Sequence, residues 1–116
     1  MEKFRNLELR TMEFTKSVIR LCRDLPHDPI TMELIKQVIR SSGSVGANYR
    51  EANEKLSKKD FALRIKIARK EAKETTYWLE LLQEIAPALS DRIALSVRES
   101  EELRNILSAI LIKVNT

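Results

Sequence analysis

The sequence predicts an all-α protein, an antiparallel up-down-up-down bundle of four helices, and three observations support this fold class. The 116 residues include only two glycines and three prolines, too few for a loop-rich or hairpin-rich protein. Hydrophobic residues make up 43% and charged residues 33% of the chain, which suits a single domain over residues 1–116 with one core. Apolar residues recur at spacings of three and four along most of the chain, as on one face of a helix.

The first helix is expected over residues 2–25. Its heptad-like apolar stripe comprises Phe4, Leu7, Thr11, Phe14, Val18, Leu21 and Leu25. Pro26 and Pro29 end this helix, because proline lacks a backbone donor and disfavours helical geometry in the residue before it. The connection is short, so the next helix should return antiparallel. We interpret His27 as a solvated or capping residue, and Cys22 as a small buried hydrophobe without a disulfide partner.

The second helix should begin near residue 30 and end near residue 55, although it contains both glycines. Its core stripe comprises Ile35, Val38, Ser42, Val45, Tyr49, Ala52 and Leu56. A polar seam beside the stripe comprises Gln37, Ser41, Ser44, Asn48 and Glu51, and a small-residue face comprises Gly43, Gly46 and Ala47. Each glycine costs on the order of 1 kcal/mol of helix propensity. The small face therefore predicts close approach of another backbone, from this chain or from a neighbouring subunit.

The third helix is expected to begin after Ser57 and to stop before Pro87, since Ser57 and Asp60 have the spacing of a reciprocal N-terminal cap. Its core stripe comprises Phe61, Ile65, Ala68, Ala72, Thr75, Leu79 and Leu82. The fourth helix follows a turn over residues 88–91. Its stripe comprises Ile93, Val97, Ser100, either Leu103 or Arg104, Leu107, Ile110 and Val114.

Two adjacent helices carry a longer pattern. It reads Ser41-x-x-Ser44-Val45-x-Ala47-Asn48-x-x-Glu51-Ala52, then Phe61, then Ile67-Ala68-x-x-Glu71-Ala72-x-Glu74-Thr75-x-Tyr77-Trp78-Leu79. From about Phe14 to Leu82 the chain resembles bacterial four-helix-bundle proteins encoded in intervening sequences of large-subunit ribosomal RNA genes. It is more remotely similar to accessory proteins of diversity-generating retroelements. The resemblance implies an antiparallel bundle that assembles as a pentamer, and the retroelement branch is associated with nucleic acid and reverse transcriptase. Many members have glycine where this chain has Ala52.

A second apolar row lies on the third helix, about 120° from its core stripe on a helical wheel. The row comprises Leu63, Ile67, Trp78, Leu81 and Ile85. Either a wider core within the chain covers this row, or it forms a subunit interface. Exposed apolar patches of this extent usually mark contacts. We therefore expect a homo-oligomer that uses this row and the small-residue face.

The polar seam needs partners because a bundle would partly desolvate it. Arg64 and Glu71 on the third helix could supply them, with Arg40 and Arg50 as further candidates. The alternative is a catalytic carboxylate pair, Glu51 with Glu71 or Glu74. We favour a structural network, since no nucleophile or histidine base accompanies these acids. An enzyme is therefore not expected.

No metal, nucleotide or other cofactor site is expected from the motifs. Di-iron bundles use Glu-x-x-His pairs, whereas the only histidine here lies in a turn, and Gly43-x-x-Gly46 lacks the Gly-Lys-Ser/Thr ending of a phosphate loop. No run approaches the roughly 18 apolar residues of a membrane span, and the first residues lack the apolar region of a secretion signal. We expect a cytoplasmic protein.

Charge is the clearest functional signal. Residues 55–73 contain eight basic residues and two acids, whereas residues 74–116 contain four basic residues and seven acids. The predicted nucleic-acid-binding residues are Lys55, Lys58, Lys59, Lys66, Arg69, Lys70 and Lys73. A solvated helix face is the alternative meaning of this stripe. We expect a non-enzymatic oligomer that binds RNA or DNA by its phosphates, or else a scaffold that docks an acidic or nucleic-acid-processing protein. Aromatic residues are sparse, so base-specific recognition of single strands has little support.

Overall fold

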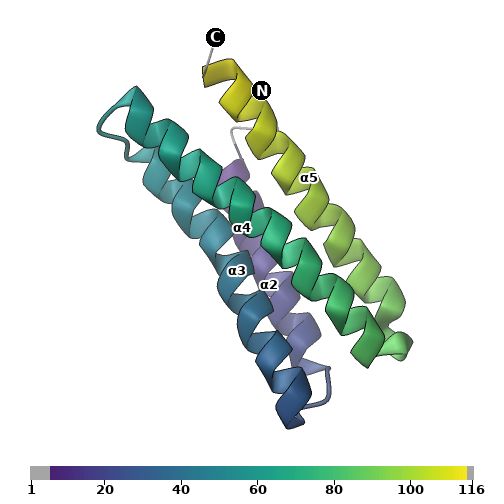
Figure 1. Cartoon of the computed structure of the whole chain (residues 1–116). Coiled ribbons are helices and arrows are strands. Elements are labelled where there is room, and N and C mark those ends of the chain that lie inside the picture. The colour runs from purple at the N-terminus through teal and green to yellow at the C-terminus, as the bar shows by residue number, and fades with distance from the viewer. Residues whose placement is uncertain (1–5, 115–116) are drawn as a thin grey trace.

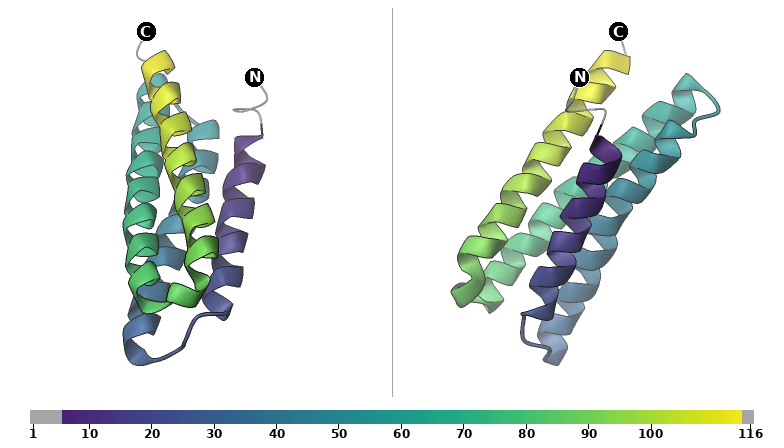
Figure 2. Two further views of the ribbon diagram at one scale, coloured as in Figure 1. Left: turned by 90° about the vertical axis from the view of Figure 1, so that its right-hand side faces the viewer. Right: turned by 180° about the vertical axis from the view of Figure 1, so that it is seen from behind.

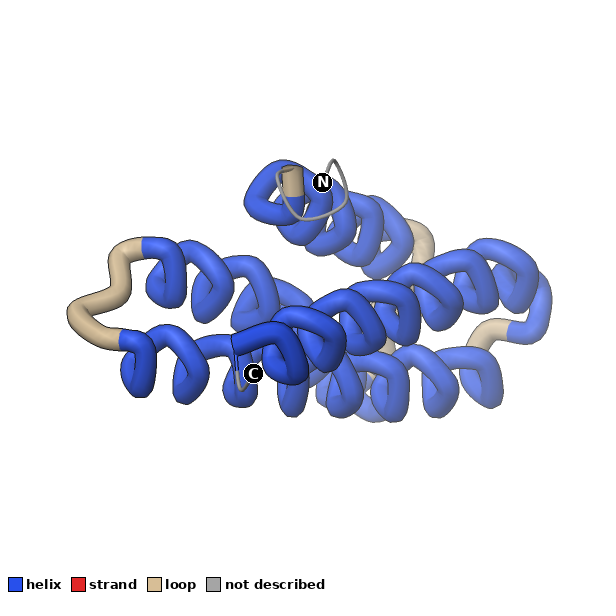
Figure 3. The backbone as a smooth tube through the Cα atoms, turned by 90° about the horizontal axis from the view of Figure 1, so that it is seen from above, coloured by secondary structure: helices blue, strands red, loops and turns tan. Residues whose placement is uncertain are grey.

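The computed structural model describes residues 6–114 and confirms the four-helix bundle. Helices α2 (Leu7–Arg23), α3 (Pro29–Asn53), α4 (Lys58–Ile85) and α5 (Ser90–Val114) run alternately up and down, and a short 3-10 turn, η1 (Pro87–Leu89), precedes α5. The start of α2 and the end of α5 consequently lie at the same end of the bundle (Figures 1 and 2). Between the start of α2 and the end of α5, loops occur only at the connections between helices (Figure 3). The expected start of the first helix, with Phe4, lies outside the described residues.

The predicted stripes form one buried core. In α2 the described stripe residues are all buried. On α5 the core position is occupied by the buried Leu103, whereas Arg104 is half-buried and lines the surface between α4 and α5. Phe61 and Val97 pack at the margin of this core. Full burial of a leucine or isoleucine contributes about 1.5–3 kcal/mol. The apolar periodicity read from the sequence therefore also accounts for what holds the helices together.

Side-chain caps define the first turns of the two central helices, α3 and α4. Asp28 caps α3, accepting from the Thr31 N–H at 3.0 Å and from the Thr31 hydroxyl at 2.9 Å, and these bonds lower the pKa of Asp28. Ser57 caps α4 by accepting from the Asp60 N–H at 3.0 Å. Asp60 reaches back, as predicted, but it accepts from the Leu56 N–H at 3.3 Å, one residue before the Ser57 cap.

The expected extension of the α3 stripe to Leu56 is wrong. The helix ends at Asn53, and Leu56 lies in the turn before α4 with 97% of its surface exposed. The chain must reverse direction between Asn53 and Lys58, so its backbone leaves helical geometry before the apolar spacing is completed. A periodic residue beside a turn therefore carries little information about the core.

The helices pack to different extents. α4 lies between α3 and α5 and packs extensively on both, and α2 packs mainly on α3. The smaller contact between α2 and α5 is reinforced by Arg10, whose Nε and Nη2 atoms each donate to Glu99 at 2.8 Å. This two-pronged hydrogen bond raises the pKa of Arg10.

The small face of α3 meets α2 at one point. A Cβ atom added to Gly46 would lie 2.9 Å from Thr11 Oγ1 and 3.2 Å from Thr11 Cβ, whereas one added to Gly43 would meet only Thr15 Cγ2, at 4.0 Å. Gly46 is buried and Ala47 is exposed. The close approach that Gly46 permits is therefore with α2 of the same chain, one of the alternatives left open by the sequence.

A candidate nucleic-acid interface

Basic side chains from two helices line one hollow between α4 and α5. The lining residues, called here the basic hollow, are Lys66, Arg69, Lys70, Lys73, Arg104 and Ser108. The first four recur at spacings of three, one and three along α4, so they share one face of that helix. Arg104 and Ser108 come from α5. The hollow has a volume of about 410 Å³ and no acidic lining residue.

The five cations of the basic hollow are not neutralised inside the bundle. Among residues 6–114, none of them forms an ion pair with a carboxylate. Like charges gathered in one place repel each other, and an anion that enters the hollow relieves this repulsion. The hollow is thus suited to phosphate groups.

The structure separates the other three predicted cations from the basic hollow. Lys55 and Lys58 line a different hollow at the start of α4, together with Phe61, and Lys55 Nζ lies 5.8 Å from the centre of the Phe61 ring. Lys58 precedes Lys66 by eight residues, about 12 Å along a helix. Lys59 is exposed and lines neither hollow. Four of the seven predicted residues therefore share one site.

A second hollow, called here the Tyr77 hollow, adjoins the basic hollow. It has a volume of about 550 Å³ and shares Lys70, Lys73 and Arg104 with the basic hollow; its other lining residues are Glu74, Thr76, Tyr77, Glu80 and Glu101. Tyr77 is 56% exposed and contacts the Trp78 ring edge-to-face, with ring centres 5.1 Å apart. An accessible aromatic ring therefore lies next to the unpaired cations.

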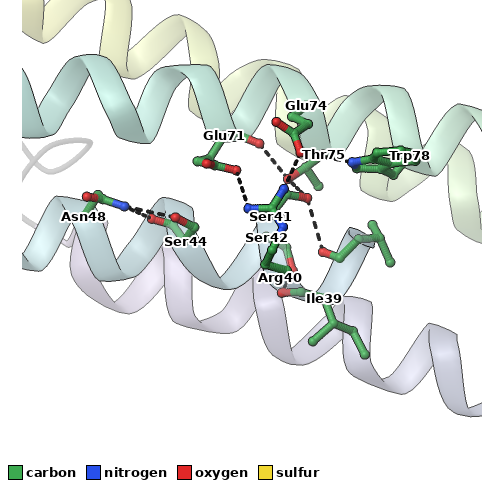
Figure 4. A network of polar contacts seen from close by, with 11 residues as sticks. Ile39, Arg40, Ser41, Ser42, Ser44, Asn48, Glu71, Glu74, Thr75 and Trp78 are labelled. Atoms are coloured by element: carbon green, nitrogen blue, oxygen red, sulfur yellow. Dashed lines mark hydrogen bonds and ion pairs between the residues drawn. The ribbon is translucent and has the colours of Figure 1, made fainter. Parts of the chain in front are cut away.

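The polar seam between α3 and α4 is built around Arg40 (Figure 4). Arg40 donates from Nη1 to Glu71 at 3.2 Å and also pairs with Glu74, which in turn accepts from the Trp78 indole N–H at 3.3 Å. Deeper in the same interface, the buried Thr75 hydroxyl donates to Ser41 Oγ at 2.8 Å. These bonds join α3 to α4 and give the buried hydroxyls the partners they need.

Asn48 extends the seam. Its Nδ2 atom donates to the Ser44 carbonyl at 2.9 Å and to Ser44 Oγ at 3.0 Å, and its Oδ1 atom accepts from Arg64 at 3.1 Å. The structure therefore brings together Ser41, Ser44, Asn48, Arg64 and Glu71 across one helix interface.

Glu51 does not belong to this network, which corrects the predicted seam. It is exposed, and among residues 6–114 no hydrogen bond or ion pair joins it to the other seam residues. It also lies eleven residues beyond Arg40, about 16 Å along the helix. Arg40 pairs with Glu71 and Glu74. Both carboxylates proposed as catalytic partners of Glu51 therefore lie beside Arg40, far from Glu51 along α3.

Two apolar surfaces remain on the outside of the single chain. In the second apolar row of α4, Leu63 is 55% exposed and Leu81 is 36% exposed, while Ile67, Trp78 and Ile85 are half-buried. The second surface is a hollow of about 440 Å³ between α2 and α3, called here the apolar hollow. Its lining residues include Met12, Ile19, Gly43, Gly46 and Ala47. The residues predicted for a subunit interface thus line these two surfaces, but Gly46 is buried and Trp78 also packs against the core.

The fold and the sequence both match a known family. A family model described as 23S rRNA-intervening sequence protein matches residues 7–109. The chain belongs to this family. The chain is also similar to a protein of unknown function from the S23 ribosomal protein family of Bacteroides thetaiotaomicron VPI-5482, whose crystal structure is known at 1.70 Å. The two sequences are 34% identical, and the two structures align with a TM-score of 0.81. The match covers 90% of this chain and 96% of that one. No curated protein matches the chain.

In this member of the family, sequence reasoning missed two residues of the site. Arg104 was weighed as a core residue, because the periodicity of α5 did not distinguish it from Leu103. Tyr77 follows Lys73 by one helical turn, which was the available signal for placing it beside the cations.

Among the described residues, no helix combines the length and apolar character needed to cross a bilayer.

Proposed function

We propose that this family member is a homo-oligomer that binds RNA or DNA by its phosphates through the basic hollow, without catalysing a reaction. One observation carries the proposal. Five cations from two helices line a single hollow, and none of them is paired with a carboxylate among residues 6–114. If the basic residues of α4 formed only a solvated helix face, no cation from α5 would be needed beside them, yet Arg104 lines the same hollow.

The physical basis is counterion release. Each phosphate that a lysine or arginine neutralises frees a condensed cation, so affinity is strong at low salt and falls as salt rises. Arg69 and Arg104 are half-buried, and their helices hold them on opposite sides of the hollow. Less side-chain freedom is lost when such groups bind a phosphate than when fully mobile lysines do.

Self-association would multiply this weak local site. The second apolar row and the apolar hollow are the surfaces proposed to be buried between subunits, and the family resemblance suggests five copies. Several basic hollows on one assembly can bind a polyanion together, which raises the overall affinity without any new contact. Light scattering tests the assembly, because a mass near the 13.4 kDa of one chain contradicts it. Trp78→Lys should dissociate the oligomer and leave folded monomers.

A protein-docking scaffold is the second candidate function. The observation that favours it is the apolar hollow, whose exposed residues Met12 and Ile19 could contact a partner helix. In this case the basic hollow would bind acidic side chains instead of phosphates. Poly-glutamate and RNA of equal charge, used as competitors, separate the two functions.

The test is a binding assay with duplex DNA, structured RNA and single strands. A variant carrying Lys66→Glu, Lys70→Glu and Lys73→Glu should lose binding to all three. A control carrying Arg23→Glu, Lys36→Glu and Arg98→Glu has the same net charge but alters exposed residues outside the hollow, and should bind better than the first variant. Equal binding by the two variants, or no binding by the wild type at low salt, contradicts the proposal.

A further inference from the structure

We infer that the basic hollow and the Tyr77 hollow form one groove for single-stranded nucleic acid, in which an unpaired base, preferentially guanine, stacks on Tyr77. This inference rests on the proposed function and specifies its ligand. The two hollows share Lys70, Lys73 and Arg104, so a strand whose phosphates contact these three residues has its next base beside Tyr77.

Tyr77 has the properties of a stacking platform. More than half of its surface is exposed, although it is a large aromatic residue in the middle of a helix. Bases of any sequence can stack on such a ring, and stacking contributes substantially to single-strand binding. The low aromatic content of the sequence argued against base recognition, but the fold places the exposed tyrosine next to the unpaired cations.

The neighbouring contacts hold this platform in place. Tyr77 packs edge-to-face on Trp78, with an angle of 69° between the rings. The Trp78 indole N–H donates to Glu74, and Glu74 pairs with Arg40 of α3 (Figure 4). A ring supported in this way loses little freedom when a base stacks on it, which favours binding.

The acidic residues of the Tyr77 hollow indicate which base is preferred. Glu80 and Glu101 line this hollow but not the basic hollow, and both are exposed without an ion pair among the described residues. A carboxylate only accepts hydrogen bonds. Guanine presents two adjacent donors, N1–H and N2–H, on its Watson–Crick edge, whereas adenine presents one amino group beside an acceptor. The same carboxylates repel phosphates, so the strand's backbone is directed toward the basic hollow.

Duplexes cannot use the Tyr77 end of the groove, because their bases are stacked and paired inside the helix. Single strands expose bases that can be splayed onto aromatic side chains and bonded along their Watson–Crick edges. Phosphate contacts alone would bind both forms. Preference for unpaired guanine is therefore the property that this inference adds.

The experiment uses the full chain and short single strands of one length, either uridine RNA or deoxyuridine DNA. Each strand carries guanine, adenine or an abasic site at its centre. A duplex is measured alongside them. Tyr77→Ala should weaken binding of the guanine strand by about five- to one-hundred-fold and leave duplex binding unchanged. Tyr77→Phe keeps the ring and should bind as the wild type does. Glu80→Ala with Glu101→Ala should abolish the preference for guanine over adenine. Trp78 is the only tryptophan, and its emission should change with the guanine strand but not with the abasic one.

Three results overturn the inference, and they are distinguishable. If the wild type binds neither strand nor duplex, the proposed function fails and the inference with it. If the wild type binds both, and Tyr77→Ala weakens them equally or not at all, the proposed function stands and stacking on Tyr77 is refuted. If Tyr77→Ala acts selectively but guanine binds no better than adenine, the role of Glu80 and Glu101 is refuted.

Discussion

Replacing Gly46 by alanine should destabilise the bundle, whereas the same change at Gly43 should stabilise it. Both glycines lie inside α3, so each substitution should gain up to about 1 kcal/mol of helix propensity. At Gly43 the new methyl group would meet only Thr15 Cγ2 at 4.0 Å, which is ordinary contact. We therefore expect Gly43→Ala to raise the free energy of unfolding by about 0.5–1 kcal/mol.

At Gly46 the gain in propensity is opposed by overlap with Thr11. The added Cβ would lie 2.9 Å from Thr11 Oγ1 and 3.2 Å from Thr11 Cβ. Thr11 is buried, and its hydroxyl donates to the Glu8 carbonyl, so the side chain cannot simply rotate away. Overpacking of this kind costs about 1–3 kcal/mol. The net effect should be a loss of about 0–2 kcal/mol, and the two variants should differ by about 1–3 kcal/mol.

Urea unfolding followed by circular dichroism measures both values. The measurement should be repeated at several protein concentrations, because an effect exerted through a subunit interface changes with concentration and one within the chain does not. Thr11→Ala combined with Gly46→Ala should cost less than the sum of the single changes, since the overlapping hydroxyl is gone. If Gly46→Ala proves as stabilising as Gly43→Ala, the close contact between α2 and α3 is refuted.

Three further predictions concern the polar contacts and the single cysteine. Arg40→Ala should lower the free energy of unfolding by about 1 kcal/mol, because the Glu71 side chain is only 12% exposed and loses its cation; an unchanged urea midpoint would contradict this. Arg10→Ala should speed hydrogen exchange in α2 more than in α4, because it removes both hydrogen bonds that join α2 to Glu99 of α5. An equal increase in the exchange rates of α2 and α4 would contradict this. Burial raises the pKa of Cys22 from 9.0 to about 11, so the folded state favours the neutral thiol. Its stabilisation is full below pH 9 and is lost as pH rises to 11, and Cys22→Ala should remove this pH dependence.

Local signals in the sequence were sufficient to predict the fold. The cap at Ser57 and the break at Pro87 placed both ends of α4 within a residue or two, and the apolar stripes identified most of the core. Leu56 was misplaced because periodicity says nothing about where the backbone must turn.

The site was less predictable, because it depends on how neighbouring helices are rotated against each other. A helical wheel groups the lysines of α4 but does not show that Arg104 faces them from α5. The same limit applies to Glu51, which the wheel groups with Asn48 but which is exposed in the bundle. Gly46 signalled a close approach, and only the packed structure identifies Thr11 as the residue approached.

The central claim is that the basic hollow binds phosphates, and the salt dependence of binding tests it most directly. If all five cations contact phosphates, the logarithm of affinity should fall against the logarithm of salt with a slope of about 3.5–4.5 for each hollow engaged. Arg104→Ala should reduce this slope by about 0.7–0.9 per hollow. Arg98→Ala removes the same charge from α5 at an exposed position outside the hollow, and should leave the slope unchanged. Equal slopes for the wild type and both variants would contradict the claim.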